Sequence, residues 1–290
     1  MDYGLNALPP RDPALEARLN QAMNGLRLGR PCYAFQELAS TMDVAHQLAL
    51  DGAPEGACVW AETQTKGRGR AGRQWASAPG GIYLSLVLRP TREVSELPQL
   101  ALVAGLATAQ AIHELTNLSP TIRWPNDVFL SGQKVGGILT EAKSPSRPQS
   151  TAENGDVSIF QLGHQKIETS RIYAVVGIGV NVTTDLRNLP EGATALGQHA
   201  QPAPDRFALA ATLFRHLEQA YQQWNDTGFT AIRPALLPWI GLFGQPVHIT
   251  AGSRQFEGTA SDLDDHGRLL VRLDAGLVRA FDVGEVTLLR

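Results

Sequence analysis

A glycine- and arginine-rich segment carries the sharpest chemical signal in the chain. Its sequence is Gly67-Arg68-Gly69-Arg70-Ala71-Gly72-Arg73, and Trp75 follows it. Glycines let a backbone fold tightly against a ligand, and the arginine side chains concentrate positive charge beside it. This segment, residues 67–73, is named the Gly-Arg loop, and it predicts an anion-binding site. Arg-Gly runs also occur in RNA-binding tails and solvated loops, but this run occurs once and lies between two predicted strands.

Two further motifs carry polar groups in unusual settings. The first is Arg123-Trp124-Pro125-Asn126-Asp127, with Lys134-Val135-Gly136-Gly137-Ile138-Leu139 downstream. It is difficult to explain as core filling, although a packed tryptophan, a Pro-Asn-Asp turn and a solvated lysine would be the structural alternative. The second is Gly177-Ile178-Gly179-Val180-Asn181-Val182, an apolar strand whose glycines permit close approach and whose asparagine interrupts the apolar run.

A set of regular elements must position these motifs. Ser40 and Thr41 are suited to cap a helix that Gly52 closes. Apolar and aromatic runs predict strands at 57–62, 82–88, 121–124, 128–130, 134–142 and 172–182. Helical periodicity predicts helices over about 98–117 and 204–224, and a second short helix ending before Pro238.

The remaining segments define the ends and one insertion. Residues 1–30 form a polar arm with only a short helical pattern over 14–23, and residues 143–171 form a mobile insertion with one edge hairpin near 157–160. After Gly241, five short strands at 247–249, 255–258, 269–271, 278–281 and 286–288 are separated by turn residues. Such closely spaced strands predict a small β-barrel.

Composition excludes several classes of protein. With 290 residues and 43% hydrophobic content, the chain can bury one large domain and a small one. Its formal net charge of −3 provides no overall attraction to nucleic acid or an anionic membrane. The start lacks a signal-peptide pattern, and the longest apolar stretch, 100–112, is too short to span a bilayer. We therefore expect a soluble cytoplasmic protein in which Cys32 and Cys58 are buried small residues.

Taken in order, these motifs resemble those of biotin protein ligases. The resemblance rests on the Ser-Thr helix start, Gln64, the Gly-Arg loop, the Trp-Pro-Asn-Asp run, the Lys-x-Gly-Gly-Ile-Leu run and the Gly-x-Gly-x-Asn strand. It covers about residues 36–230 and, more loosely, the C-terminal strands. It implies an α+β fold of the class II synthetase-like kind: a catalytic domain over 31–240, with a mixed sheet and helices on one face, followed by an SH3-like barrel over 241–290.

The resemblance also implies a reaction and its participants. Biotin and ATP would give biotinyl-5′-AMP and pyrophosphate, with Mg²⁺ accompanying the nucleotide. A lysine of a biotin carboxyl carrier protein, an acetyl-CoA carboxylase subunit or related carboxylase, would then take the biotin. The enzyme would work by positioning and charge stabilisation, because the carrier supplies the nucleophile.

Site residues are carried over from the resemblance position by position. Lys134 and Arg70 would be the catalytic residues. Biotin would be bound by Ser40, Thr41, Gln64, Gly67, Arg68, Gly69, Arg70, Lys134, Gly136 and Gly137, with the first three on its ureido ring. ATP would be bound by Arg70, Arg73, Trp75, Asn126, Asp127, Lys134 and Asn181, with Trp75 facing the adenine and Asp127 facing Mg²⁺.

Departures from the family pattern leave alternatives open. Arg123 and Met42 stand where many members have Lys and Asn, so a ligand role for Arg123 is in doubt. Only about 35 residues precede the Ser-Thr helix, so we expect the monofunctional form without DNA binding, as a monomer or homodimer. The rival hypotheses are a lipoate or octanoate ligase of the same fold, a non-catalytic biotin or nucleotide sensor, and an Arg-Gly nucleic-acid module.

Overall fold

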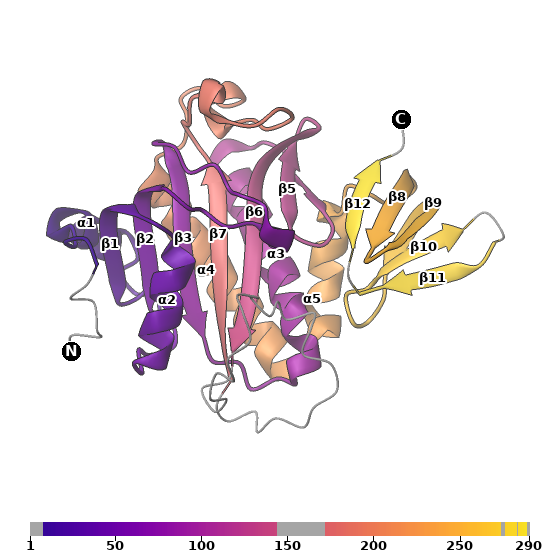
Figure 1. The fold of residues 1–290 in the computed structure, drawn as a ribbon, viewed down its shortest axis with the longest axis horizontal. Coiled ribbons are helices and arrows are strands. Elements are labelled where there is room, and N and C mark those ends of the chain that lie inside the picture. The colour runs from indigo at the N-terminus through magenta and orange to yellow at the C-terminus, as the bar shows by residue number, and fades with distance from the viewer. Residues whose placement is uncertain (1–7, 144–171, 274–275, 283, 289–290) are drawn as a thin grey trace.

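A mixed sheet of seven strands lies at the centre of the larger part of the molecule (Figure 1). The computed structural model describes residues 8–143, 172–273, 276–282 and 284–288. The strand order is β1-β2-β3-β7-β6-β5-β4, with β1 parallel to β2 and every other neighbouring pair antiparallel. The strands are β1 Cys32–Leu38, β2 Cys58–Gln64, β3 Gly81–Leu88, β4 Thr121–Arg123, β5 Asp127–Leu130, β6 Gln133–Lys143 and β7 Tyr173–Asn181.

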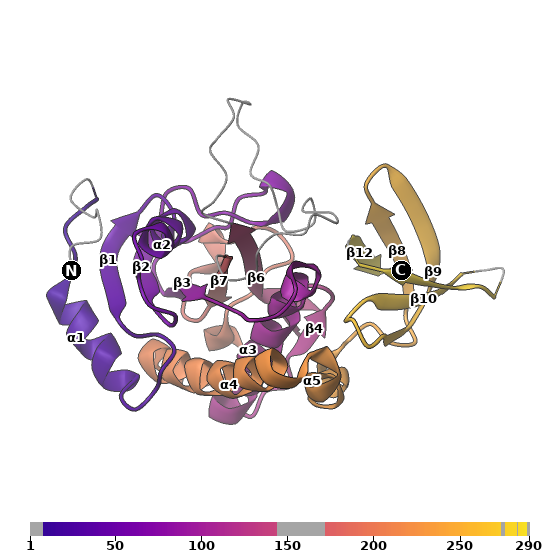
Figure 2. The same cartoon turned by 90° about the horizontal axis from the view of Figure 1, so that it is seen from below.

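Helices cover both faces of this sheet. Figure 2 shows α2 (Thr41–Leu50) on one side and α1 (Pro13–Ala22), α3 (Leu100–Thr116) and α4 (Arg206–Thr227) on the other. Apolar side chains of α2 form one core cluster with one face of the sheet, and those of the other three helices form a second cluster with the opposite face. The expectation of helices on one face is therefore wrong. Helix periodicity predicts which side of a helix is buried, but not which face of a sheet it covers.

Most predicted elements, including the short helix expected over 14–23, are confirmed within a few residues, and one strand is added. Strand β1 was not predicted, although its sequence CYAFQEL is mostly buried. Helix α1 lies in the predicted arm, yet its Leu15 and Leu19 are buried in the same cluster as α3 and α4. The short α5 (Phe229–Leu236) follows α4, and 3₁₀ turns lie at η2 Arg70–Gly72, η3 Val94–Gln99, η6 Leu186–Asn188, η7 Leu196–Gln198 and η8 Leu237–Trp239. The predicted insertion, with its hairpin near 157–160, falls almost wholly in residues 144–171, outside the described residues.

The C-terminal strands form a second, antiparallel sheet. The five are β8 Pro246–Ala251, β9 Arg254–Leu263, β10 Leu269–Leu273, β11 Val278–Phe281 and β12 Glu285–Leu288. Their order is β11-β10-β9-β8-β12, so β11 and β12 are the two edges within the described residues. The five predicted strands are confirmed as one antiparallel sheet, and among the described residues β11 and β12 do not pair to close it into the predicted barrel.

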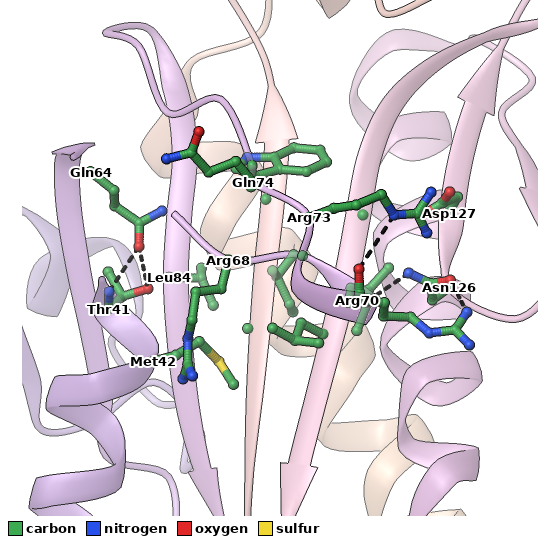
Figure 3. Close-up of a pocket in the computed structure, with 18 of the residues that line it drawn as sticks. Thr41, Met42, Gln64, Arg68, Arg70, Arg73, Gln74, Leu84, Asn126 and Asp127 are labelled. Carbon is green, nitrogen blue, oxygen red and sulfur yellow. Dashed lines mark hydrogen bonds between the residues drawn. The ribbon is translucent and has the colours of Figure 1, made fainter. Parts of the chain in front are cut away.

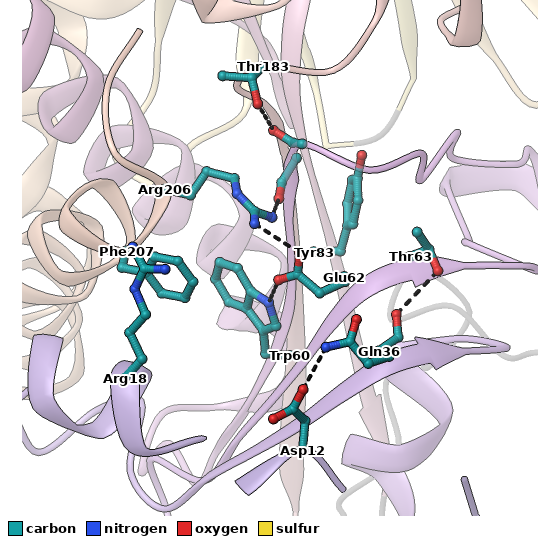
Figure 4. A network of polar contacts seen from close by, with 12 residues as sticks. Asp12, Arg18, Gln36, Trp60, Glu62, Thr63, Tyr83, Thr183, Arg206 and Phe207 are labelled. Atoms are coloured by element: carbon teal, nitrogen blue, oxygen red, sulfur yellow. Dashed lines mark hydrogen bonds and ion pairs between the residues drawn. The ribbon is translucent and has the colours of Figure 1, made fainter. Parts of the chain in front are cut away.

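A polar network ties the start of β3 to α4 (Figure 4). The Arg206 guanidinium donates to the Gly81 carbonyl oxygen at 2.9 Å and to Glu62 Oε2 at 2.8 Å. Glu62 also accepts a hydrogen bond from Trp60 Nε1 at 2.9 Å. The network therefore fixes the start of β3 against α4.

Candidate functional site

A pocket lies between the start of α2, the Gly-Arg loop and the middle strands of the larger sheet (Figure 3). It brings together most of the predicted site residues. Those that line it are Thr41, Gln64, Arg68, Gly69, Arg70, Arg73, Trp75, Asn126, Asp127, Lys134 and Gly137. The sequence-distant motifs therefore meet in one cavity, as predicted.

One end of the pocket consists of neutral hydrogen-bonding groups. Gln64 Oε1 accepts from the Thr41 backbone N–H at 2.8 Å and from the Thr41 hydroxyl at 3.1 Å. Gln64 Nε2 donates to Ser77 Oγ at 2.8 Å. Since the Thr41 hydroxyl proton is directed at Gln64, its oxygen accepts from Ser85 Oγ at 2.8 Å. These contacts hold Thr41 and Gln64, the neutral end, in fixed orientations.

The Gly-Arg loop folds as a tight hairpin beside this end. Trp75 N–H donates to the Gly67 carbonyl oxygen at 2.9 Å, and Gly69 N–H donates to the Arg73 carbonyl oxygen at 2.7 Å. The turn is made by Ala71 and Gly72, both with positive φ, at 53° and 72°. The hairpin therefore presents its arginine side chains from a defined backbone.

The opposite end of the pocket is cationic. Lys134 Nζ is 2.7 Å from Asp127 Oδ1, and the Arg70 guanidinium donates to Asn126 Oδ1 at 2.8 Å. Asn126 is fixed in turn, because its Nδ2 donates to the Ile138 carbonyl oxygen at 3.0 Å. Burial lowers the pKa of the Arg70 guanidinium, but so strong a base stays charged at neutral pH. Two positive groups therefore stand close to one carboxylate.

The Trp75 ring lies over a floor of glycines. A Cβ atom at Gly179 would stand 2.5 Å from Trp75 Cε2, and one at Gly137 would stand 2.9 Å from Cζ3. The ring can occupy this position only because those two residues lack side chains. Lys134 Nζ is 5.3 Å from the ring centroid, within cation–π range. The glycines of both strand motifs thus make room for an aromatic plane.

Contacts from the C-terminal sheet reach the cationic end. Arg73 forms an ion pair with Glu285 at 2.8 Å, and the Arg70 guanidinium lies 3.5 Å from the Gly284 carbonyl oxygen. Trp124, which is 2% exposed, donates from Nε1 to the Gly267 carbonyl oxygen at 3.0 Å. The Trp-Pro-Asn-Asp run therefore joins the C-terminal sheet on one side and the pocket on the other.

Four predicted ligand residues do not line the pocket. Ser40 and Asn181 are buried, and each has an oxygen, Oγ and Oδ1 respectively, without a hydrogen-bond partner among the described residues. Asn181 donates from Nδ2 to the Thr194 carbonyl oxygen at 3.0 Å, in a loop whose backbone pairs with Lys134. Gly67 and Gly136 are packed against neighbouring backbone. These residues support the pocket in this structure rather than face it.

Several lining residues were not predicted as ligands. They are Met42, Gln74, Leu84, Ile138, Leu139, Gly177, Ile178 and Gly179. Met42 Sδ stands 2.6 Å from where a Cβ atom of Gly177 would lie, so this glycine of the Gly-x-Gly-x-Asn strand makes room for the methionine. Arg123 does not line the pocket, and its guanidinium lies 3.6 Å from the centroid of the Phe129 ring.

Other predictions concern cysteines, metals and membranes. Cys32 and Cys58 are buried free thiols, as predicted, on adjacent positions of β1 and β2. Within the described residues, no cluster of three or more His, Cys, Asp or Glu side chains could hold a metal ion. Among the same residues, no helix combines the length and apolar character needed to cross a membrane.

Comparison with known proteins gives consistent matches over both parts of the chain. Residues 34–155 match the biotin/lipoate A/B protein ligase family, and residues 242–289 match the biotin protein ligase C-terminal domain. The bifunctional ligase/repressor BirA of Bacillus subtilis is 33% identical over 84% of this chain and 70% of its own length. The biotin–[acetyl-CoA-carboxylase] ligase of Paracoccus denitrificans is 34% identical over 76% of this chain and 85% of its own.

A solved structure supports the same assignment. The biotin protein ligase of Aquifex aeolicus, solved in complex with biotin and ATP, has a TM-score of 0.70 at 27% identity. The match covers 90% of this chain and 99% of that one. This likeness confirms the predicted fold class. With these identities and coverages, the chain belongs to the biotin protein ligase family.

Proposed function

We propose that this chain joins biotin to ATP, giving biotinyl-5′-AMP and pyrophosphate, and then transfers biotin to a lysine of a carboxylase carrier protein. One observation carries the proposal: a single pocket joins a neutral hydrogen-bonding end to a cationic end through an apolar middle. Biotin has three matching parts in the same order: a ureido ring, a hydrocarbon chain and a carboxylate. Membership of the family makes the chain a ligase, and the residue roles below are proposals.

The neutral end suits a ureido ring. Gln64 Nε2 has two N–H groups, and with one directed at Ser77, the second can donate to the ureido carbonyl oxygen. The Thr41 hydroxyl oxygen can accept from a ureido N–H. A buried urea whose groups stay unpaired would lose about 1–3 kcal/mol for each of them. A contact between Ser40 and the ring stays a prediction, because Ser40 Oγ is buried and Ser40 does not line the pocket.

The cationic end suits the bond-forming step. A biotin carboxylate oxygen attacks the α-phosphorus of ATP, the bond from that phosphorus to the bridging oxygen breaks, and pyrophosphate leaves. Two anions approach each other in this step, and Lys134 and Arg70 supply the opposing charge. Preorganised donors of this kind are among the largest contributors to catalysis. The Trp75 ring, over its glycine floor, provides a flat face for the adenine.

Asp127 fits a magnesium ion carried in with the nucleotide. Mg²⁺ is bound in such sites by one or two carboxylates, substrate phosphate oxygens and water. Asp127 is a carboxylate of this kind, already beside Lys134 at 2.7 Å, and the described residues offer no cluster that would hold the ion without the nucleotide. When bound, the ion would neutralise phosphate charge, and Asn126 would keep Arg70 oriented next to it.

The second step needs no nucleophile from this chain. The carrier's lysine amine attacks the acyl carbon of biotinyl-5′-AMP, the bond between that carbon and the phosphate oxygen breaks, and AMP leaves. The task of the pocket is to hold the mixed anhydride in position until the carrier arrives. Lipoate and octanoate have no ureido group, so the paired donors and acceptors of Thr41 and Gln64 favour biotin over these substrates.

Incubation with biotin and α-labelled ATP tests the proposal directly. We expect pyrophosphate release that depends on biotin, formation of labelled biotinyl-AMP, and biotin on an added carrier domain. Replacing biotin with octanoate is the matched control, and it should give neither product. Binding of biotin without pyrophosphate release would instead identify a sensor, and activity with octanoate alone would identify a lipoate-type ligase.

A further inference from the structure

Glu141 is a buried carboxylate that the proposed reaction does not use. It lies on β6, two residues beyond the pocket-lining Leu139, and its side chain is 10% exposed. Its Oε2 is 2.7 Å from His46 Nε2 and 3.1 Å from an Arg68 guanidinium nitrogen. A buried carboxylate is costly unless such partners compensate it. Burial would raise the pKa of Glu141, but the His46 hydrogen bond and nearby positive charges outweigh it, so the pKa is lowered and the group is ionised.

His46, on α2, contacts the Glu141 carboxylate and holds it in place. It lies on α2, the helix whose first residue is Thr41 of the neutral end, and it is 5% exposed. Burial lowers the pKa of its imidazole, which favours the neutral ring. A neutral ring that donates from Nε2 to Glu141 leaves Nδ1 to accept from the Tyr173 hydroxyl at 3.3 Å. Both imidazole nitrogens of His46 then have a hydrogen-bond partner, so the ring holds the Glu141 carboxylate in one orientation.

Arg68 connects this buried pair to the Gly-Arg loop. Figure 3 shows its side chain extending from the loop toward Met42, away from Arg70 and Asn126. The guanidinium is also 3.1 Å from Asp43 Oδ1, but Asp43 has a side chain 61% exposed, so solvent screens that pair. Glu141 is the buried partner and holds the arginine more firmly. With two carboxylates beside it, Arg68 is poorly suited to be the main anion ligand.

We propose that Glu141, held by His46, is a positioning residue that orients Arg68 and keeps the Gly-Arg loop closed over the biotin end of the pocket. The inference rests on the proposed function, and it assigns different tasks to the arginines of the loop. Arg68 anchors the loop to β6 and α2, whereas Arg70 faces the reacting carboxylate and phosphate. Replacing Glu141 would leave Lys134 and Arg70 of the cationic end in place. Biotin would then bind beside a Gly-Arg loop whose position is less well fixed. The effect of the replacement should therefore fall on the KM for biotin rather than on kcat.

A double-mutant cycle tests whether Glu141 acts through Arg68. The proteins are the wild type, Glu141→Gln, Arg68→Gln and the double variant, assayed for biotinyl-AMP formation at varied biotin concentrations. We expect each single variant to raise the KM for biotin about tenfold, as loss of a charge-assisted hydrogen bond does, with kcat changed less than about threefold. The double variant should be no worse than Arg68→Gln by more than about twofold, because residues that act in series are not additive.

Glu62→Gln is the matched control. Glu62 also pairs with an arginine, Arg206, at 2.8 Å, and both side chains are 20% exposed, but neither residue lines the pocket. It should lower thermal stability to a similar extent without changing the KM for biotin. If Glu62→Gln and Glu141→Gln change the KM equally, or if the effects of Glu141→Gln and Arg68→Gln simply multiply, the positioning role is wrong.

A second variant covers the case in which Glu141→Gln folds poorly. His46→Gln keeps an N–H donor for Glu141, so we expect the KM for biotin to rise less than in Glu141→Gln, again with kcat unchanged. A fall in kcat at unchanged KM in His46→Gln would overturn the inference. Wild-type protein that makes no biotinyl-AMP at all would instead refute the proposed function, which separates the two failures.

Discussion

The two ends of the pocket are built from different kinds of contact. At the neutral end, Thr41 and Gln64 come from the start of α2 and the end of β2, and hydrogen bonds to Ser77 and Ser85 hold them. At the cationic end, Arg70 and Arg73 come from a loop, and groups of a second sheet contact them. The neutral end is preformed by secondary structure. At the cationic end Lys134 stands on β6, but the positions of the arginines depend on how a loop and the C-terminal sheet come together.

This difference suggests that one end of the pocket serves mainly in binding and the other mainly in catalysis. A preformed end can recognise a ring by hydrogen bonds that need no rearrangement, which favours ground-state binding. Cations held where charge develops during the reaction interact most strongly with the transition state. Substitutions at the two ends should therefore separate in their kinetics, the neutral end through KM and the cationic end through kcat and retention of the intermediate.

The largest effect is expected at Lys134. Lys134→Gln removes the charge at the point where, in the proposed complex, the carboxylate and α-phosphate meet, so we expect biotinyl-AMP formation to fall about 10²- to 10³-fold. Biotin affinity measured by isothermal titration should change far less. Lys66→Gln, an exposed lysine outside the pocket, is the control and should behave like the wild type. Lost biotin affinity with normal turnover of bound biotin would make Lys134 a binding residue only and erase the distinction between the ends.

Arg70→Gly should release the intermediate rather than prevent its formation. In the proposed complex the guanidinium bridges the loop and the acyl phosphate, and loss of about 1.5–3 kcal/mol would raise escape roughly ten- to a hundredfold. The measurement is biotin on serum albumin when variant, ATP and biotin are mixed without carrier. Arg187→Gly, which removes an exposed arginine paired with Asp185, is the control. Unchanged labelling of albumin, with biotin still adenylated, would contradict retention by Arg70.

Gln64→Ala tests the neutral end. Gln64 holds Thr41, and in the proposed complex it also donates to the ring, so we expect the KM for biotin to rise about tenfold while kcat at saturation changes less than about threefold. Gln36→Ala deletes a comparable amide on β1 away from the pocket and should leave both constants unchanged. A loss of kcat as large as that of Lys134→Gln would show that the two ends do not act separately.

The smallest effect is expected from Glu285→Gln. It removes the ion pair with Arg73, but both side chains are more than half exposed, at 51% and 60%, so the pair contributes less than about 1 kcal/mol. We expect the KM for ATP to change less than about threefold, and less still in high salt. A tenfold or larger rise would mean that the C-terminal sheet controls the cationic end through this pair rather than through the buried Trp124 contact.

The sequence predicted the residues that line the pocket better than the residues and strands that hold the lining in place. Glycines, arginines and the Trp-Pro-Asn-Asp run are unusual residue types for a core, so their spacing indicated ligand contact. Glu141 lies in an ordinary strand, and nothing local indicates that it meets His46, 95 residues away. Strand β1 was missed because its apolar run after Pro31 is only four residues long, and periodicity alone cannot tell so short a run from part of a buried helix. Long-range pairings of this kind are not encoded in local periodicity.

The reaction rate of the two buried thiols with an added reagent reports on local unfolding. Cys32 and Cys58 are the only two cysteines of the sequence, and they are 3% and 0% exposed in the cluster that includes the apolar side chains of α1. Burial raises the pKa of the Cys58 thiol, so little thiolate is present while the cluster is closed. An alkylating reagent can therefore react at an appreciable rate only during transient openings. The rate of labelling in the native state then gives the free energy of opening for the β1 edge and the N-terminal helix.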